Sequence, residues 1–276
     1  MISDFKRKYL SIGEFAKLCE VPRKTLIFYD NLGIFSPEYK NEKGYRFYSI
    51  NQYDTFAILA ELREMGMPLD EIKDYLDKRN PENYIEMLYS EKEKINEKIN
   101  KLKFINEAID NKIKVAKVGL ETIENKEPYI KMVEKEYLIA TDINSKTQKD
   151  ITLEIIDFIS YCIKQDLYKG YPISAMVSEE SIKNGDFTDI DKICMKLDDE
   201  IESDKLIIKE EGLYACINHK GSYETTYKSY KILVDFIKEN NYVIVGSSYE
   251  MSLLDYFSIK SEEEYITEIA IPIELG

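Results

Sequence analysis

The sequence has little of the chemistry that metal sites and catalytic sites most often use. Its 276 residues include one histidine, no tryptophan and four cysteines. The cysteines lie far apart and form no C-x-x-C motif or Cys/His cluster: Cys19, Cys162, Cys194 and Cys216. This spacing lacks the common zinc-site and disulfide patterns and predicts free thiols in a reducing compartment. We therefore expect no bound metal and no cofactor.

Long apolar runs are also missing. No uninterrupted apolar stretch of the sequence approaches the roughly 18 residues that span a bilayer. The amino-terminal residues do not form the apolar core of a signal peptide. We therefore expect a soluble, cytoplasmic protein without a membrane partner.

Charge is distributed unevenly along the chain. The net charge is −14, yet residues 1–48 contain nine Lys and Arg against six Asp and Glu. A strongly acidic protein does not coat nucleic acid non-specifically, because phosphate binding needs local positive charge. A small basic head on an acidic body fits these numbers, and the length favours two domains.

The first 80 residues predict a winged helix-turn-helix. Ser11 and Glu14 form a capping box that begins a short helix. Pro22 can begin a second helix, which Gly33 ends, and the separation of about three residues is typical of a helix-turn-helix. Turn residues followed by an alternating stretch within residues 35–48 predict a small hairpin, the wing.

Several motifs occur in order along this domain. They are Tyr9-Leu-Ser-Ile-Gly-Glu-Phe-Ala-Lys-Leu, Val21-Pro-Arg-Lys-Thr-Leu, Tyr29-Asp, Leu32-Gly-Ile-Phe-Ser-Pro, Gly44-Tyr-Arg-Phe-Tyr-Ser, Leu62-Arg-Glu-Met-Gly and Pro68-Leu-Asp-Glu-Ile-Lys. Together they resemble the MerR family of transcription regulators. The resemblance implies double-stranded promoter DNA and RNA polymerase as partners.

The recognition helix and the wing supply the expected DNA contacts, because cationic and phenolic side chains donate to phosphate oxygens. The candidates are Arg23, Lys24, Thr25, Tyr29, Tyr45, Arg46, Tyr48 and Arg63. Tyr48 is equally well suited to the core. Ile27 and Phe28 replace the Arg-Tyr pair usual in the family, and we expect this loss to weaken DNA binding regardless of DNA sequence.

A long helix follows over residues 81–118. Asn80 and Pro81 predict its start, and no further proline or glycine occurs before Gly119. Positions spaced by alternating steps of three and four are apolar except at Lys92 and Asn106: Ile85, Leu88, Ile95, Ile99, Leu102, Ile109, Ile113 and Ala116. Such a stripe predicts a coiled coil. Similarity to MerR regulators implies an antiparallel homodimer; the alternative is a helix that packs on its own domain.

A linker, residues 119–128, leads to a domain over residues 129–276, which gives the chain an α+β fold. The pattern predicts a β-α-β-β unit used twice, with a pocket where the two halves meet. The first unit has a strand at 129–141, a helix at 152–165 and strands at 173–178 and 193–197. The second has a strand at 212–218, a helix at 223–239 and strands at 243–249 and 265–273.

Four motifs in this domain carry a second resemblance: Gly212-Leu-Tyr-Ala-Cys-Ile, Gly221-Ser-Tyr-Glu, Tyr249-Glu-Met and Glu263-Glu-Tyr-Ile-Thr-Glu. They resemble the GyrI-like effector-binding domain of multidrug-sensing MerR regulators. The resemblance makes Glu250 the acidic centre of a drug pocket. A buried carboxylate among tyrosines favours an aromatic or cationic ligand. The candidate ligand contacts are Glu250, Tyr265, Tyr223, Tyr227 and Tyr171.

We therefore expect a ligand-responsive transcription activator that distorts promoter DNA and senses lipophilic cations. One alternative is a hydrolase, but Cys216 and the single histidine, His219, point to opposite faces of one predicted strand, which argues against an enzyme. A second alternative is a ligand sequestrant or a repressor that does not activate. Metal sensing is disfavoured because no cysteine lies at either end of the long helix.

Overall fold

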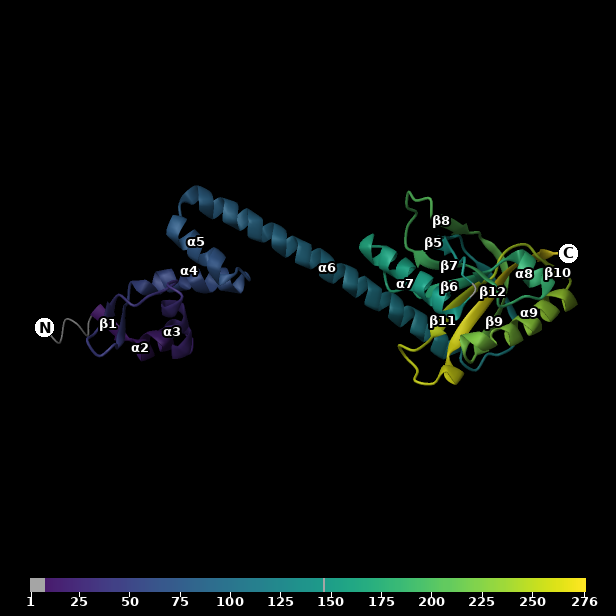
Figure 1. Cartoon of the computed structure of the whole chain (residues 1–276), viewed down its shortest axis with the longest axis horizontal. Helices are drawn as coiled ribbons and strands as arrows, with labels where there is room; N and C mark the ends of the chain where they lie inside the picture. The colour runs from purple at the N-terminus through teal and green to yellow at the C-terminus, as the bar shows by residue number, and fades with distance from the viewer. Residues whose placement is uncertain (1–7, 146) are drawn as a thin grey trace. The chain divides into compact units, whose positions relative to one another are not determined.

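The structure is a computed structural model that describes residues 8–145 and 147–276. The chain divides into two compact units, Met1–Asn100 and Lys101–Gly276 (Figure 1). The division falls inside the long helix α6, Pro81–Thr122, rather than at either end of it. The second half of α6 is therefore part of the carboxyl-terminal unit.

The first unit is a winged helix-turn-helix, as predicted. Its elements are β1 (Tyr9–Ser11), α2 (Ile12–Leu18), α3 (Arg23–Asn31), β2 (Tyr39–Lys40), β3 (Arg46–Ser49), α4 (Gln52–Glu64) and α5 (Leu69–Lys78). The three strands form a sheet in the order β1-β3-β2. The predicted capping box begins α2: the backbone N–H of Glu14 donates to Ser11 Oγ, and Glu14 Oε2 accepts from the backbone N–H of Ser11.

Stacked aromatic rings form the core of this unit. The ring of Tyr48 lies 4.7 Å from that of Phe15 and 5.6 Å from that of Phe35, measured between centroids. Phe56 packs edge-on against Phe15 and Phe35. The core therefore fixes the wing, through β3, to α2, to α4 and to the segment that follows α3.

Helix α6 is longer than predicted, because Gly119 does not end it. A Cβ atom at Gly119 would lie 2.6 Å from Leu254 Cγ, so the glycine allows close packing inside the helix. The helix continues to Thr122, and the predicted linker is limited to residues 123–128.

One face of the second half of α6 packs on its own domain. Val115 and Ala116 contact the cluster around Leu253 and Leu254, and Asn111 Nδ2 donates to the carbonyl oxygen of Lys169 at 3.0 Å. The alternative prediction, packing on its own domain, therefore holds for this face. Ala116 of the predicted stripe belongs to this packed face, whereas six other stripe residues remain exposed: Ile85, Ile95, Ile99, Leu102, Ile109 and Ile113.

The second unit is a sheet of two repeated halves. Strand β4 (Tyr129–Val133) precedes the first half, which contains β5 (Glu136–Asp142), α7 (Gln148–Lys164), β6 (Ile173–Val177), α8 (Glu179–Asn184), β7 (Ile190–Leu197) and β8 (Leu206–Lys209). The second contains β9 (Gly212–Lys220), η1 (Tyr223–Thr225), α9 (Tyr227–Glu239), β10 (Tyr242–Ile244), β11 (Tyr249–Leu254), η2 (Glu262–Glu264) and β12 (Ile266–Leu275).

The strand order confirms the predicted repeat. The sheet runs β4-β9-β12-β11-β6-β7-β5-β8, and β10 pairs with β12. The order β9-β12-β11 matches β5-β7-β6, so the two β-α-β-β units meet where β11 pairs with β6. Helices α7 and α9 pack on the same face of the sheet (Figure 1). We call this the helix face and the other the open face.

Two predicted strands were wrong. Residues 129–141 form two strands, since the chain leaves β4 at Val133 and continues as β5 in the other half of the sheet. Residues 243–249 do not form one strand. Four residues, 245–248, separate the two segments that pair with β12, but β12 has only residues 271–272 opposite them, so the pairing is interrupted. Pro272 has no backbone N–H to extend the ladder. Helix α7 also begins earlier than predicted, and β8 and α8 were not predicted.

In the described part of the chain, no helix is long and apolar enough to cross a membrane.

Candidate DNA-binding and effector-binding sites

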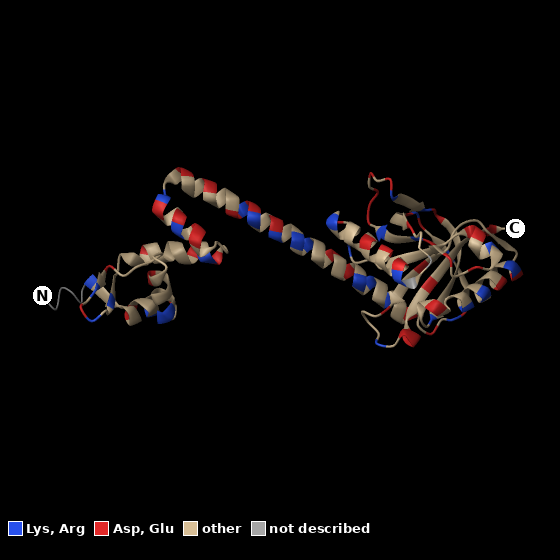
Figure 2. Ribbon diagram, in the orientation of Figure 1, with Lys and Arg blue, Asp and Glu red and all other residues tan. Residues whose placement is uncertain are grey.

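The predicted contacts of the recognition helix lie on α3. Arg23 and Lys24 are exposed, and Thr25 and Tyr29 are half-buried. The guanidinium of Arg23 lies against Gly13, where a Cβ would come within 2.5 Å of it. Figure 2 shows Lys and Arg on this head.

The two departures from the family pattern lie on the surface of α3. Ile27 is 38% exposed and Phe28 is 51% exposed. The surface where a MerR-like helix has Arg-Tyr is therefore apolar here, which supports the prediction of weakened phosphate contacts.

An ion-pair centre connects the wing to the recognition helix. Asp30 is buried and accepts from Arg46 Nε at 2.7 Å and from Lys40 Nζ at 2.8 Å. Burial alone would raise the pKa of Asp30, but the hydrogen bonds from Lys40 and Arg46 outweigh it and lower the pKa. Arg46 was predicted as a phosphate contact, and its Nε is engaged by Asp30. Tyr45 is 64% exposed on the wing.

Two other predicted DNA contacts have structural roles. Tyr48 is fully buried in the aromatic core, so the prediction that it contacts DNA was wrong and its alternative core role is correct. Burial raises its pKa to about 12. Arg63 is exposed, but its Nη1 donates to the carbonyl oxygen of Met67 at 2.6 Å, which stabilises the end of α4.

Asp30→Ala is expected to destabilise the first unit by about 1.5–3 kcal/mol, because hydrogen bonds to charged groups contribute in this range. The buried carboxylate is the acceptor that holds Lys40 and Arg46 together. Urea unfolding of the variant measures the loss. Asp54→Ala, at an exposed position in α4, is the control, and an Asp30→Ala variant as stable as this control would contradict the prediction.

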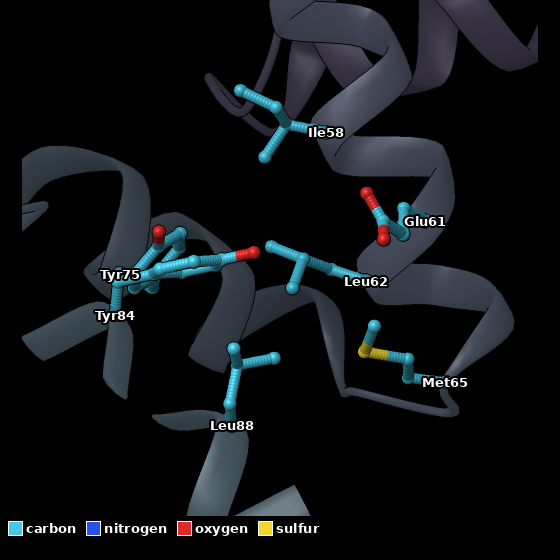
Figure 3. A pocket seen from close by; sticks show the side chains of 7 residues that line it. All are labelled: Ile58, Glu61, Leu62, Met65, Tyr75, Tyr84 and Leu88. Atoms are coloured by element: carbon cyan, nitrogen blue, oxygen red, sulfur yellow. The ribbon is translucent and has the colours of Figure 1, made fainter. Parts of the chain in front are cut away.

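A pocket of about 230 Å³ lies between α4, α5 and the start of α6 in the first unit. Figure 3 shows its lining side chains: Ile58, Glu61, Leu62, Met65, Tyr75, Tyr84 and Leu88. The tyrosine rings lie side by side with centroids 6.4 Å apart. None of the predicted ligand contacts lines this pocket.

The predicted acidic centre lies at the junction of the two repeats. Glu250 on β11 pairs with Ala175 on β6 and Ile269 on β12, and its side chain is on the helix face. The hydroxyl of Tyr230, from α9, donates to Glu250 Oε1 at 2.9 Å. Ser248 Oγ lies 2.5 Å from the same hydroxyl and accepts from the backbone N–H of Val177.

The ionisation of Glu250 is perturbed by its surroundings. Burial raises the pKa of its carboxyl to about 7, and the hydrogen bond from Tyr230 opposes this shift only in part. Burial and the neighbouring carboxylate also raise the pKa of Tyr230 well above its usual value. The hydroxyl therefore remains a donor, and Glu250 titrates near neutral pH.

Two other carboxylates lie across the sheet, on the open face. Glu268 accepts from Lys131 at 2.6 Å and from Tyr129 at 2.7 Å. Glu136 is paired with Lys196 and Lys209. Glu250 differs from both, because no Lys or Arg in residues 8–145 and 147–276 pairs with it. The described chain therefore supplies lysine partners to the two carboxylates on the open face and no cationic partner to Glu250 on the helix face.

The structure brings Tyr223 and Tyr265 together beside this strand. Their ring centroids are 5.6 Å apart, and Ser252 Oγ donates to Tyr223 Oη at 3.1 Å. Ser252 and Glu250 lie on the same side of β11, because alternate strand residues share a face. Tyr265 is largely buried, whereas Tyr223 is 44% exposed.

The other two predicted tyrosines lie elsewhere. The hydroxyl of Tyr171 donates to Asp198 Oδ1 at 2.8 Å, and Tyr171 lines an apolar pocket beside the second half of α6. Tyr227 packs against the apolar core beneath α9, with Lys231 Nζ 5.4 Å from its ring centroid. No contact joins Tyr227 to Glu250 among the described residues.

An apolar pocket of about 310 Å³ lies between the second half of α6 and the loops around Tyr168 and Phe257. Its lining includes Ser252 and is mostly apolar: Ile109, Lys112, Ile113, Val115, Ala116, Tyr168, Gly170, Tyr171, Pro172, Ser252, Leu253, Asp255, Phe257 and Ser258. Pockets of this size hold small organic molecules. Ser252 lies two residues, roughly 7 Å of strand, from Glu250.

The side chains of the alternative hydrolase site are kept apart. Cys216 is buried on the open face, and burial raises the pKa of its thiol to about 12. His219 lies on the other face, where its Nδ1 is 2.8 Å from Ser229 Oγ and burial lowers its pKa. A thiol that is neither ionised nor next to the histidine is a poor nucleophile. No group of His, Cys, Asp or Glu that could hold a metal occurs in the described residues.

Tyr230 and Ser248 were missed among the site residues. Tyr230 belongs to the apolar stripe of α9 that includes Leu233 and Ile237. A tyrosine in such a stripe indicates a buried partner for its hydroxyl. This pattern in the sequence could have identified Tyr230 as a site residue. Nothing in the sequence identified Ser248, because its position depends on the irregular segment 245–248.

The comparisons with known proteins agree with both halves of the structure. Residues 10–79 match the MerR HTH family regulatory protein, and residues 84–274 match the GyrI-like small molecule binding domain. The second match covers more than half of the chain. The chain belongs to the MerR regulators with a GyrI-like domain. It is a ligand-responsive, DNA-binding transcription regulator of a dimeric family.

Two curated relatives span nearly the whole chain. The multidrug-efflux transporter 2 regulator of Bacillus subtilis is 29% identical over 99% of both chains. The multidrug-efflux transporter 1 regulator of the same organism is 26% identical over 97% of this chain and 99% of its own. Both relatives are named as regulators of multidrug-efflux transporters.

Among solved structures, this chain is similar to EcmrR in an EcmrR–DNA complex. The alignment covers 97% of this chain and 100% of that chain, with 20% sequence identity and a TM-score of 0.45.

Proposed function

We propose that this MerR regulator activates transcription when a lipophilic cation binds beside Glu250. The observation that carries the proposal is the carboxylate itself: it is partly buried, titrates near pH 7 and has a tyrosine hydroxyl but no cationic partner in the described chain. An organic cation would supply the missing charge, and its apolar groups fit the neighbouring pocket.

The names of the two full-length relatives support the same ligand class, because both regulate multidrug-efflux transporters. We propose Glu250, Tyr223, Tyr265 and Tyr171 as ligand contacts. Tyr227 was predicted with them, but its position at the start of α9, packed against the apolar core, suits a structural role.

On the DNA side, we propose Arg23, Lys24, Thr25 and Tyr29 of α3 and Tyr45 of the wing as contacts. Arg46 positions the wing through Asp30. The bound promoter would be distorted so that RNA polymerase can engage it, with the energy of DNA deformation contributing to recognition. This mechanism requires promoter DNA and polymerase in the same compartment, the cytoplasm.

The dimer would form through the exposed stripe of α6 in an antiparallel coiled coil. Ile99 and Leu102 lie near its middle and are 43% and 65% exposed in one chain. Two copies of this stripe would bury each other's apolar side chains, as a coiled coil requires. Lys92 and Asn106 would fix the register.

Footprinting and run-off transcription on the promoter of the protein's own gene test the function. We expect protection of a near-palindromic site with or without tetraphenylphosphonium, and more transcript with it. Arg23→Ala should weaken the footprint. No protected site would overturn the regulator assignment on this promoter, and protection with less transcript would identify the alternative, a repressor.

A further inference from the structure

The lining of the apolar pocket includes a cation that belongs to the protein, the exposed side chain of Lys112. Lys112, on α6, places its ammonium 4.3 Å from the ring centroid of Phe257 and 5.9 Å from that of Tyr168. The two rings come from loops far apart in the sequence, and both line the pocket of about 310 Å³. No ion pair of Lys112 occurs in the described chain, and the two rings are its partners there.

We propose that Lys112 is a built-in competitor that occupies the aromatic part of the effector site, and that a lipophilic cation binds by displacing it. This inference rests on the proposed function, since it concerns the same ligand. It adds a subsite, formed by Phe257, Tyr168 and the α6 residues Ile109 and Ile113, to the contacts around Glu250.

The chemistry of the two cations favours displacement. A lysine ammonium is a compact and strongly hydrated charge, so placing it against rings costs part of its hydration. A quaternary cation with phenyl groups is weakly hydrated and can also cover the apolar lining. Aromatic faces attract both cations, but only the organic cation gains from the apolar surface as well.

The position of Lys112 makes displacement a signal. The loop around residues 168–171 is fastened to α6 at two points: Asn111 Nδ2 donates to Lys169 O, and Gly170 lies directly against the backbone of Ala108. A Cβ at Gly170 would be 2.2 Å from Ala108 O. Releasing Lys112 removes a contact between α6 and the effector domain next to these points. Ligand binding would thus act on α6 itself.

Binding of tetraphenylphosphonium to the full-length protein, measured by titration calorimetry, tests the inference. Neutral triphenylphosphine oxide is the comparison ligand. We expect Lys112→Met to tighten binding of the phosphonium at least fivefold and to leave the neutral compound within twofold. Lys112→Arg, which keeps a cation, should bind like the wild type.

Lys117→Met is the matched control, because it removes one positive charge from an exposed position five residues along the same helix. An equal gain from Lys117→Met would mean a general electrostatic effect and overturn the inference. A Lys112→Met variant that binds the phosphonium no better than wild type would also overturn it. If Glu250→Gln still weakens binding in that case, the proposed function stands alone; if no variant binds the phosphonium, both fail.

Discussion

Glu250→Gln is expected to weaken binding of tetraphenylphosphonium by about 30-fold, because each tenfold loss corresponds to about 1.4 kcal/mol and a contact to a charged group contributes about 2 kcal/mol. Glutamine keeps an acceptor for Tyr230 but has no charge. Neutral triphenylphosphine oxide should bind the variant as well as it binds the wild type. Titration calorimetry at pH 8 measures both affinities.

The pH dependence of binding follows from the pKa of about 7. Below that pH the carboxyl is protonated, so phosphonium affinity should fall about tenfold for each further pH unit. Between pH 8 and pH 6 we therefore expect about a tenfold loss in the wild type and none in Glu250→Gln. Glu274→Gln, an exposed carboxylate at the end of β12, is the control. Equal pH dependence in all three proteins would exclude Glu250 as the cation's partner.

The same variant should gain stability. The pKa of Glu250 is raised in the folded chain from its ordinary 4.5 to about 7. Between these values the folded chain holds a proton that the unfolded chain has released, so this contribution to stability is lost as pH rises through the window. At pH 8 the free energy of unfolding of Glu250→Gln should be about 3 kcal/mol higher than that of the wild type, since each unit of pKa shift corresponds to about 1.4 kcal/mol, and at pH 4 the difference should vanish. A variant less stable than wild type at pH 8 would contradict this assignment.

Elements with strong local signals were predictable from the sequence. The capping box at Ser11 and Pro81 at the start of α6 are each determined by residues close together in the chain. The break at Val133 has no glycine or proline to mark it, so two strands read as one. Gly119 shows the reverse: a helix-ending residue is used for packing against Leu254, which lies far away in the sequence.

The site was predicted less completely because burial and partners depend on distant residues. Nothing in the sequence around Glu268 indicated that Lys131, from a different strand, would pair with it. Tyr48 and Arg46 look alike in sequence as polar wing residues. The structure buries the first and ties the second to Asp30, 16 residues earlier.

Leu102→Lys is expected to dissociate the dimer. Leu102 is 65% exposed in the single chain, so the substitution should leave the fold of each copy intact. In an antiparallel coiled coil it lies near the middle, where both copies of the residue are buried. Burying one leucine contributes about 1.5–3 kcal/mol, so replacing both should weaken dimerisation at least about 100-fold. Analytical ultracentrifugation measures the dissociation constant.

Lys103→Glu is the matched control, since position 103 is also exposed but lies off the stripe. It should remain dimeric at concentrations where Leu102→Lys is a monomer with unchanged circular dichroism. The monomer should also lose the footprint, because one reading head makes only half of the phosphate contacts of two. A dimeric Leu102→Lys variant would exclude this stripe as the interface. It would leave the Glu250 site unaffected, because Glu250 lies wholly within one chain's carboxyl-terminal unit.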